Sequence, residues 1–456
     1  MTLKSWIAVG FSLALVYGSF FAFAGSANSS DCSDSSDCAE GYSQNVDLKQ
    51  TVQFAIDHSP EFDSMKQRLA LADDEEKSAF YRFFPSLDLT AVHGIQDSQP
   101  RLGTLGSGAP WTSQTTLSLT QNIYDNGETN TKYKIATLSE KQALLTLLEQ
   151  KNKLSLDIIS QFLTFSLNSK LVDIQEKQFG MMTKQYQSVS KDFYQGLKTK
   201  KDFLRFKTQV NRIEISLNTA KNNLEKSRLS LLKLMGLSAE NTEAFRFIPV
   251  DLEKIKSQSS TEKVNSKQHY FYRHADLQNE INDLNYRLVQ RKTWPEIFFS
   301  AAASYGSSNY VNSNQNFTDN DAVSWNALIT LKYNFFDWGL RSRDADVAFL
   351  KNKIQGNDIR VSLFAIDAII KELDLNRQQA VRNYNLASDL LRLEKDNLGF
   401  LQTEYRNGKV QYLDLVTGYD NLADAEIKFY SAATELESVK YTTLYHQGRL
   451  YEEILK

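Results

Sequence analysis

The stretch Leu119-Thr-Gln-Asn-Ile-Tyr-Asp-Asn-Gly127 returns as Leu331-Lys-Tyr-Asn-Phe-Phe-Asp-Trp-Gly339, with Leu, Asn, Asp and Gly at matching positions 212 residues apart. The same offset relates Phe193-Tyr-Gln-Gly196 to Tyr405-Arg-Asn-Gly408, and Asp202 to Asp414. A repeat of this length is far longer than a solenoid unit. The sequence therefore predicts a duplicated molecule with two similar halves.

Composition indicates that both halves are mainly helical. The 456 residues include only 19 Gly and 6 Pro, and the charged residues are interspersed with Leu, Gln and Asn, as in long helices. The formal net charge is −3, whereas nucleic-acid-binding proteins usually present a strongly basic face. We therefore expect no nucleic-acid partner.

The N-terminus indicates export. Residues 1–24 combine a positive charge at Lys4, an apolar run and Ala22-Phe-Ala24, which together predict a signal peptide, with a single membrane anchor as the alternative. Residues 25–45 form a Ser- and Asp-rich tail that we expect to be disordered. For Cys32 and Cys38 in this tail, a disulfide and a metal site both stay open.

The first repeat, 46–236, has a predictable order of elements. An amphipathic helix from about Val46 to Tyr81 ends before Pro85, because proline blocks helix continuation. Alternating apolar residues then predict two strands, and a long run without Gly or Pro predicts a helical hairpin. We place these elements at about 86–98, 111–124 and 127–236.

The second repeat, 267–456, follows the same plan after a Ser-, Lys- and Gln-rich linker at 237–266. A helix again ends at a proline boundary, Pro295, and two strands and a helical hairpin follow. We place these later elements at about 296–306, 323–336 and 339–450.

Turn residues mark the junctions between the elements. Asp and Gly two residues apart predict a strand-to-helix turn, because Gly adopts a positive φ and Asp bonds nearby backbone groups. These residues are Asp125, Gly127, Asp337 and Gly339. Gly196 and Gly408 predict the points where each helical hairpin reverses. A lysine cluster follows the first reversal, and both a solvated helix face and a partner contact stay open for it: Lys198, Lys200 and Lys201.

The strand count predicts an oligomer. Four strands are too few for a closed barrel, and these strand pairs lack the apolar support of an independent sheet. Three copies would supply twelve strands, and the long helices would continue beyond them. We therefore expect a membrane-embedded barrel extended by a helical tunnel, with a small soluble sheet against the helices as the alternative.

These motifs, in this order and doubled at one offset, resemble the TolC family of outer-membrane efflux and secretion channel proteins. Prolines before the first strand of each half correspond to Pro85 and Pro295, and the family's strand ends to Tyr124-Asp-Asn-Gly127 and Phe336-Asp-Trp-Gly339. The resemblance implies a mainly α fold with a small β part, built from duplicated helix–strand–strand–helix–helix halves. It further implies a homotrimer whose 12-stranded outer-membrane β-barrel is continued by a long periplasmic α-helical barrel.

The resemblance implies a passive exit duct of a tripartite efflux pump or a type I secretion system. Its place would be the cell outer membrane of a Gram-negative-type bacterium, extending into the periplasm. Its partners would be a periplasmic adaptor (membrane fusion) protein, an inner-membrane pump or ABC transporter, and outer-membrane lipid. The substrate, and the choice between efflux and secretion, stay open. A structural coiled-coil envelope protein or adhesin without a pore is the alternative.

The resemblance also implies an entrance at the second hairpin. In similar proteins, an aspartate just after the last hairpin turn joins a ring of carboxylates at the constriction, and the turn tyrosine helps to hold it shut. Asp414 and Tyr405 occupy these positions. The family's second acidic position is Thr417 here, so a ring of three carboxylates rather than six should bind cations less strongly.

The sequence contains no recognisable catalytic motif. None of the five His lies in a metal-binding spacing or in a nucleophile motif, and no Gly-rich phosphate loop with a Lys-Ser/Thr ending occurs. We therefore expect neither enzyme activity nor a cofactor. The energy for transport would come from a partner.

Overall fold

The computed structural model describes residues 44–95, 111–238, 245–255, 269–309, 321–407 and 409–455. The chain divides into two units, Met1–Gln44 and Asn45–Lys456, and the second carries nearly all of the described residues. The expected signal peptide, both cysteines and nearly all of the N-terminal tail lie outside the described residues. So do Gly408 and most of the expected linker.

The described chain is mainly helical with a small β part, as predicted, and its elements follow the duplicated order. In chain order they are β1 (Gln44–Val46), α2 (Leu48–His58), α3 (Pro60–Tyr81), β2 (Ser86–Ile95), β3 (Trp111–Tyr124), α4 (Glu128–Tyr194), α5 (Lys200–Leu234), β4 (Phe245–Phe247), α6 (Tyr270–Arg291), β5 (Glu296–Asn309), β6 (Asp321–Lys332), α7 (Leu340–Arg406), α8 (Tyr412–His446) and α9 (Leu450–Leu455).

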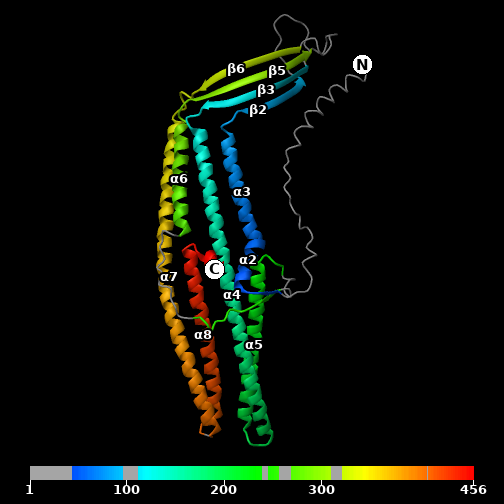
Figure 1. Cartoon of the computed structure of the whole chain (residues 1–456), viewed down its shortest axis with the longest axis vertical. Coiled ribbons are helices and arrows are strands. Elements are labelled where there is room, and N and C mark those ends of the chain that lie inside the picture. The colour runs from blue at the N-terminus through cyan, green and yellow to red at the C-terminus, as the bar shows by residue number, and fades with distance from the viewer. Residues whose placement is uncertain are drawn as a thin grey trace, which may run out of the picture. The chain divides into compact units, whose positions relative to one another are not determined.

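The repeat is visible in the helix lengths. Helices α4 and α7 both have 67 residues, and α5 and α8 both have 35. At about 1.5 Å per residue, each of the two longest helices extends for roughly 100 Å. They lead from the sheet at one end to two helical hairpin tips at the other (Figure 1). The two halves therefore run side by side over their whole length.

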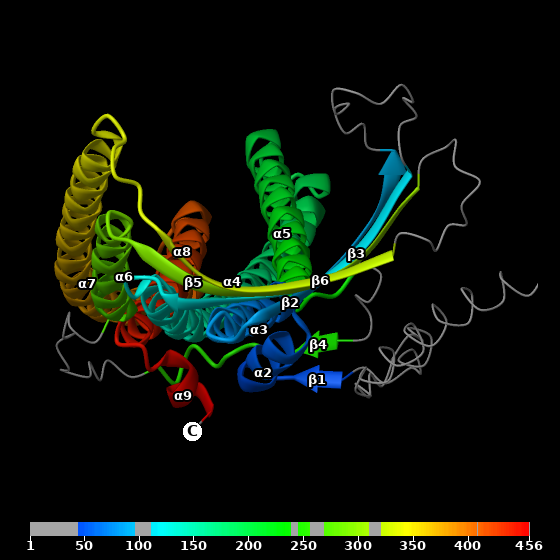
Figure 2. The ribbon, with the colours of Figure 1, turned by 90° about the horizontal axis from the view of Figure 1, so that it is seen from above.

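The four long strands form one antiparallel sheet in the order β2-β3-β5-β6. Cross-strand partners join odd-numbered residues to odd-numbered ones, up to a bulge between Asn122 and Tyr124. Because side chains alternate along a strand, all odd-numbered residues before that bulge share one face. Figure 2 shows that the sheet is curved.

Three expected boundaries were wrong. The helix expected from about Val46 to Tyr81 is two helices, because Pro60 lacks an N–H and starts α3 as its first residue. Strand β6 ends at Lys332 instead of about 336, because β5, its neighbour among the described strands, starts opposite it, at Glu296 after Pro295. Strand β5 itself extends to Asn309, beyond the expected 306, because β3 pairs with it as far as Trp111.

The main apolar core lies around the middle of α4. Ile158, Ile159, Phe162 and Leu163 of this helix are almost fully buried. They belong to one cluster with side chains of α2, α5, the β1–β4 pair and Leu450 at the start of α9. The short elements α2, β1, β4 and α9 therefore pack around the middle of α4. They supply apolar contacts that the two long hairpins alone would lack.

A pair of histidines joins the two ends of the second repeat beside this core. His269 caps the start of α6, and its Nδ1 accepts a hydrogen bond from the backbone N–H of Phe271. The remaining proton of neutral His269 is then on Nε2, which donates to Nδ1 of His446 at 3.1 Å. Burial lowers the pKa of both rings, that of His446 to about 4. The pair is therefore neutral at pH 7.

We predict that acid weakens this junction. Between pH 6.5 and 4 the unfolded chain binds protons that folded His446 excludes, so the free energy of unfolding falls as the pH drops through this range. Because the ring is partly exposed, we expect a loss of about 1–2 kcal/mol. Guanidinium titrations of the detergent-solubilised protein at pH 7.5 and 4.5 measure this loss. His446→Asn should remove most of it, and the exposed His58→Asn should not; equal behaviour of both variants would contradict the assignment.

Candidate functional site

The predicted site residues lie in two regions at opposite ends of the long helices (Figure 1). The strand-to-helix turns are next to the sheet, and the hairpin tips are at the far end. Pro85 and Pro295 stand directly before β2 and β5, at the same end as the turns. The structure thus separates the residues of the turns from those of the proposed entrance.

Each strand-to-helix turn is held by one aspartate. Asp125 Oδ1 accepts from the backbone N–H of Gly127 at 3.0 Å, and its Oδ2 accepts from that of Thr129 at 2.7 Å. Burial raises the pKa of Asp125, but the hydrogen bonds from Thr129 and Gly127 outweigh burial and lower it. The carboxylate therefore caps the first turn of α4, where backbone N–H groups lack helical partners.

The second turn repeats this geometry. Asp337 accepts from the backbone N–H groups of Gly339 at 3.1 Å and Arg341 at 3.2 Å, and the Arg341 side chain lowers the pKa of Asp337. Gly127 and Gly339 have φ values of +75° and +83°, a region that costs L-residues with a Cβ free energy. The two predicted Asp-x-Gly turns therefore work as identical helix starts.

One arginine links the first turn to the other repeat. Arg291, the last residue of α6, donates to the carbonyl oxygen of Gly127 at 2.9 Å and to the hydroxyl of Thr131. Asn126 returns a hydrogen bond to the carbonyl oxygen of Arg291 at 2.9 Å. A Cβ on Gly127 would come within 2.9 Å of the Arg291 guanidinium. The base of the sheet therefore holds both repeats together.

The first hairpin tip is basic and internally hydrogen-bonded. Helix α4 ends at Tyr194, and just beyond it the N–H of Gly196 donates to the carbonyl of Phe193. Thr199 caps α5 by accepting from the N–H of Asp202. The rings of Phe193 and Phe203 stack across the tip with centroids 4.9 Å apart. The predicted lysine cluster is exposed: Lys198, Lys200 and Lys201.

The second hairpin tip carries the predicted entrance residues. Tyr405 is half-buried in the last turn of α7, and Asp414 is exposed in the first turn of α8. Thr417 lies one turn after Asp414 and is also exposed, with its hydroxyl donating to the carbonyl of Leu413. Since residues three apart share a helix face, Asp414 and Thr417 present their side chains to the same side.

Asp420 joins the two hairpins, and the sequence pattern did not reveal it. Its carboxylate accepts from the side-chain amide of Gln178 on α4 at 2.7 Å and from that of Gln209 on α5 at 3.0 Å. Val416 of the same helix packs against an apolar cluster of α4 and α5. Burial raises the pKa of Asp420, and Asp424 nearby raises it further. The residues next to Asp420 in the sequence give no sign of this contact, because a solvated aspartate on a helix has the same local pattern.

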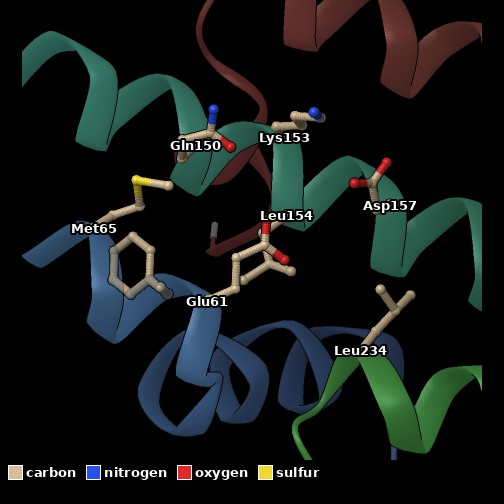
Figure 3. A pocket seen from close by; sticks show the side chains of 8 residues that line it. Glu61, Met65, Gln150, Lys153, Leu154, Asp157 and Leu234 are labelled. Carbon is tan, nitrogen blue, oxygen red and sulfur yellow. The ribbon is translucent and has the colours of Figure 1, made fainter.

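A small pocket between α3, α4 and α5 is too small for an organic ligand. Glu61 and Met65 of α3 face Gln150, Lys153 and Asp157 of α4, with Leu234 of α5 at one side (Figure 3). Its volume of about 30 Å³ is room for about one water molecule. Burial raises the pKa of Asp157, although Lys153 opposes this. This pocket therefore offers no substrate site.

The described residues offer neither a cluster of metal-ligating side chains nor a helix that could cross a membrane. No group of three or more His, Cys, Asp or Glu side chains in the described ranges has an arrangement that could hold a metal ion. None of the helices in the described part of the chain has both the length and the apolar character needed to cross a membrane.

Residues 51–237 match the family model described as outer membrane efflux protein. The first repeat is therefore similar in sequence to outer membrane efflux proteins. This match covers the first repeat, and the second repeat has the same fold. The family consists of channel proteins rather than enzymes. This match agrees with the TolC-like resemblance, the outer-membrane location and the efflux role that the sequence predicts.

Solved structures share the fold of the whole chain. The outer membrane protein VceC from Vibrio cholerae is similar with a TM-score of 0.74 and 15% identity, over 88% of this chain and 96% of that chain. The CmeC outer membrane channel of Campylobacter jejuni has a TM-score of 0.75 and 13% identity, over 88% and 86%. The open state of the MtrE outer membrane channel of Neisseria gonorrhoeae has a TM-score of 0.66 and 15% identity, over 89% and 88%. Curated protein sequences gave no match.

We predict that removing the Asp420 carboxylate loosens the contact between the hairpins. Asp420→Ala leaves the amides of Gln178 and Gln209 without their acceptor, which costs about 1–2 kcal/mol. Hydrogen exchange of the amides at 412–424 should then accelerate about 5- to 30-fold. The matched control is Asp424→Ala, an exposed carboxylate one turn further on. Equal exchange in the two variants would show that Asp420 does not hold the hairpins.

Proposed function

We propose that three copies of this chain form the passive exit duct of a tripartite efflux pump. A periplasmic adaptor and an inner-membrane transporter would deliver the substrate and the energy, and this chain would supply no catalysis. The observation that carries the proposal is the sheet, which has one apolar face, one polar face and two free edges. Two further observations, on α7 and at the second hairpin tip, support it.

The two faces of the sheet differ sharply in polarity. The odd-numbered face is apolar, and its residues on β6 are strongly exposed, with 77% for Val323, 79% for Trp325 and 72% for Ile329. Ser, Thr, Gln and Asn dominate the even-numbered face, which includes Gln114, Thr116, Ser118, Thr120, Ser300, Ser304, Ser324, Asn326 and Thr330. This alternation is typical of membrane strands with lipid on one side and an aqueous channel on the other.

The edges of the sheet require partners. Among the described strands, β2 and β6 each have a neighbour on one side only, so within the described chain each has a row of backbone N–H and C=O groups without a strand partner. In lipid such groups must be hydrogen-bonded. Strands β2 and β6 run antiparallel to each other, so β6 of one copy can pair with β2 of the next. Three copies then form a closed sheet of twelve strands.

Helix α7 has an uncovered apolar stripe that fits the same trimer. Leu340, Val347, Ile354, Val361 and Leu375 are exposed and follow a spacing of seven, with Ala368 at the intervening position. After a step of eleven, the spacing of seven resumes with Leu386, Leu393 and Phe400. Heptad and eleven-residue steps are the spacings of coiled-coil seams. A helix of a neighbouring copy would bury this stripe.

The second hairpin tip supports an entrance at the far end of the duct. Asp414 is exposed on the first turn of α8, so three copies would present three carboxylates around the axis. Carboxylate rings attract cations and select for them in channels. Tyr405 and Thr417 on the same tip would complete the constriction. The adaptor would bind near the tips, where the turns of both hairpins and the exposed lysines of the first are found.

We predict discrete channel conductance from the purified protein. In planar bilayers, detergent-solubilised trimers should give stepwise currents of uniform size, because the polar face of the closed sheet would line a water-filled pore. The mass of the complex, measured in the same preparation, should equal three chains. A trimer of correct mass that inserts into bilayers without any conductance would contradict the exit-duct function. It would instead agree with a structural envelope protein.

We predict that cation block depends on the number of carboxylates at the tip. Asp414→Asn should reduce block by divalent cations on the side of the helical tips at least about tenfold, because the ring loses all three charges. Thr417→Asp should strengthen block, since it adds three carboxylates on the same helix face. Single-channel recordings with increasing Mg²⁺ measure both. If neither variant changes the block, Asp414 does not line the constriction.

A further inference from the structure

The two hairpin tips have the same fold and opposite charge. Residues 177–212 of the first hairpin contain nine basic and two acidic side chains, a net charge of +7. The equivalent residues 389–424 of the second hairpin contain four basic and seven acidic side chains, a net charge of −3. Duplication placed the same backbone at both tips, so this reversal concerns only what the surfaces bind.

The basic residues of the first tip follow the helical heptad. Lys177, Lys184 and Lys191 step by seven along α4, and Arg205 and Arg212 step by seven along α5. We call them the α4 row and the α5 row. Lys184 and Lys191 each follow a buried residue, Met182 and Val189, by two positions. Two residues correspond to about 200° of rotation around the helix, so the side chains of the α4 row point away from the buried contact with α5.

The second hairpin reverses these same positions. At the offset of 212, the α4 row corresponds to Asp389, Asp396 and Thr403, and the α5 row to Thr417 and Asp424. All five cations have thus been replaced by acidic or neutral residues. Charged residues of either sign keep a helix surface soluble. Solubility alone therefore does not explain why the charge changes sign between equivalent positions of the two hairpins.

The cations of the first tip outnumber the carboxylates near them. All nine basic side chains between 177 and 212 are exposed, and no salt bridge joins any of them to another described residue. Lys198 and Arg205 interact electrostatically with Asp202, and Arg212 interacts with Asp420. In the second tip, by contrast, Arg392 pairs with Asp389 and Lys409 with Glu404, each at 3.6 Å. A trimer would bring three such basic tips together, and their mutual repulsion would favour an acidic surface that covers them.

Apolar side chains stand among these cations. Tyr194 and Leu197 at the turn are 78% and 71% exposed. The stacked rings of Phe193 and Phe203 and the Thr199 cap hold the tip in shape before any partner arrives. A membrane surface would meet only the turn, whereas the two rows extend for several helical turns along the sides. Charged rows at a spacing of seven match a partner that is itself helical.

We infer that the first hairpin alone forms the docking surface for a helical partner with acidic side chains at heptad spacing. This inference rests on the proposed exit-duct function, because the partner would be the adaptor. It specifies the chemistry of that adaptor and the number of equivalent sites. The trimer offers three basic docking surfaces, and the acidic second hairpins repel the same partner.

A pair of designed peptides tests the docking surface. The probe is a soluble coiled-coil peptide with Glu at its e and g positions, and its counterpart has Lys at those positions. Fluorescence anisotropy with the detergent-solubilised trimer should show saturable binding of the Glu peptide, three per trimer. Binding should weaken at least tenfold between 50 and 500 mM salt, and the Lys peptide should not bind. Equal binding of both peptides would overturn the inference.

Two double variants, each of which removes two positive charges, distinguish docking on the α5 row from non-specific electrostatic attraction of the peptide. Arg205→Gln with Arg212→Gln should weaken binding of the Glu peptide at least tenfold. Lys226→Gln with Lys233→Gln removes two exposed cations that are also seven apart on the same helix but lie far from the tip, and it should weaken binding less than threefold. Equal losses in both variants, or preferential binding of phosphatidylglycerol vesicles, would overturn the inference. Dissociation of the trimer in the α5-row variant would do the same, because the row would then be a contact between copies.

Conductance separates this inference from the proposed function. The α5-row variant should conduct in planar bilayers like the unmodified protein while losing the Glu peptide. If the unmodified trimer binds the Glu peptide at three sites but does not conduct, the docking surface stands and the exit-duct function fails. If it conducts but does not bind the peptide, the function stands and the docking surface fails.

Discussion

Each of the two 67-residue helices follows a strand of the sheet, and an aspartate just before the helix fixes its first turn. Asp125 and Asp337 each accept two backbone N–H groups of the helix that follows. A shift of one residue at the start of a 67-residue helix would rotate every later side chain by about 100° and move it by about 1.5 Å. The seams of both hairpins therefore depend on these two turns, and Arg291 ties the first of them to the second repeat.

The same backbone serves different purposes in the two halves. Helix α4 of the first repeat is central: it packs against α5, α3, α6 and α8 and carries the middle of the core. Helix α7 of the second repeat is peripheral, with few buried residues and a long apolar stripe in the open. Duplication provided two equal hairpins, and divergence of their surfaces made one an inner support and the other an edge. The opposite charges of the tips are part of this divergence.

Local chemistry made much of the fold predictable. A long sequence without Gly or Pro, an Asp-x-Gly start and a glycine at the reversal predict a helical hairpin without knowledge of its neighbours. The expected boundaries were wrong where pairing with a neighbouring strand determines where an element ends. Strand β6 stops at Lys332 because β5 offers no partner beyond Glu296. The break at Pro60 did have a local signal, since proline at the first helical position starts a new helix.

The sequence by itself determined the duplication, the junctions and the apolar and polar sides of each element, because spacing and turn chemistry act over a few residues. Only the tertiary structure decided which distant residues meet. Asp420 finds Gln178 and Gln209 from 242 and 211 positions away, and His446 finds His269 from 177. A polar side chain on a helix has the same local pattern whether water or another helix faces it. Its role is settled by packing, which brings the second hairpin against the first.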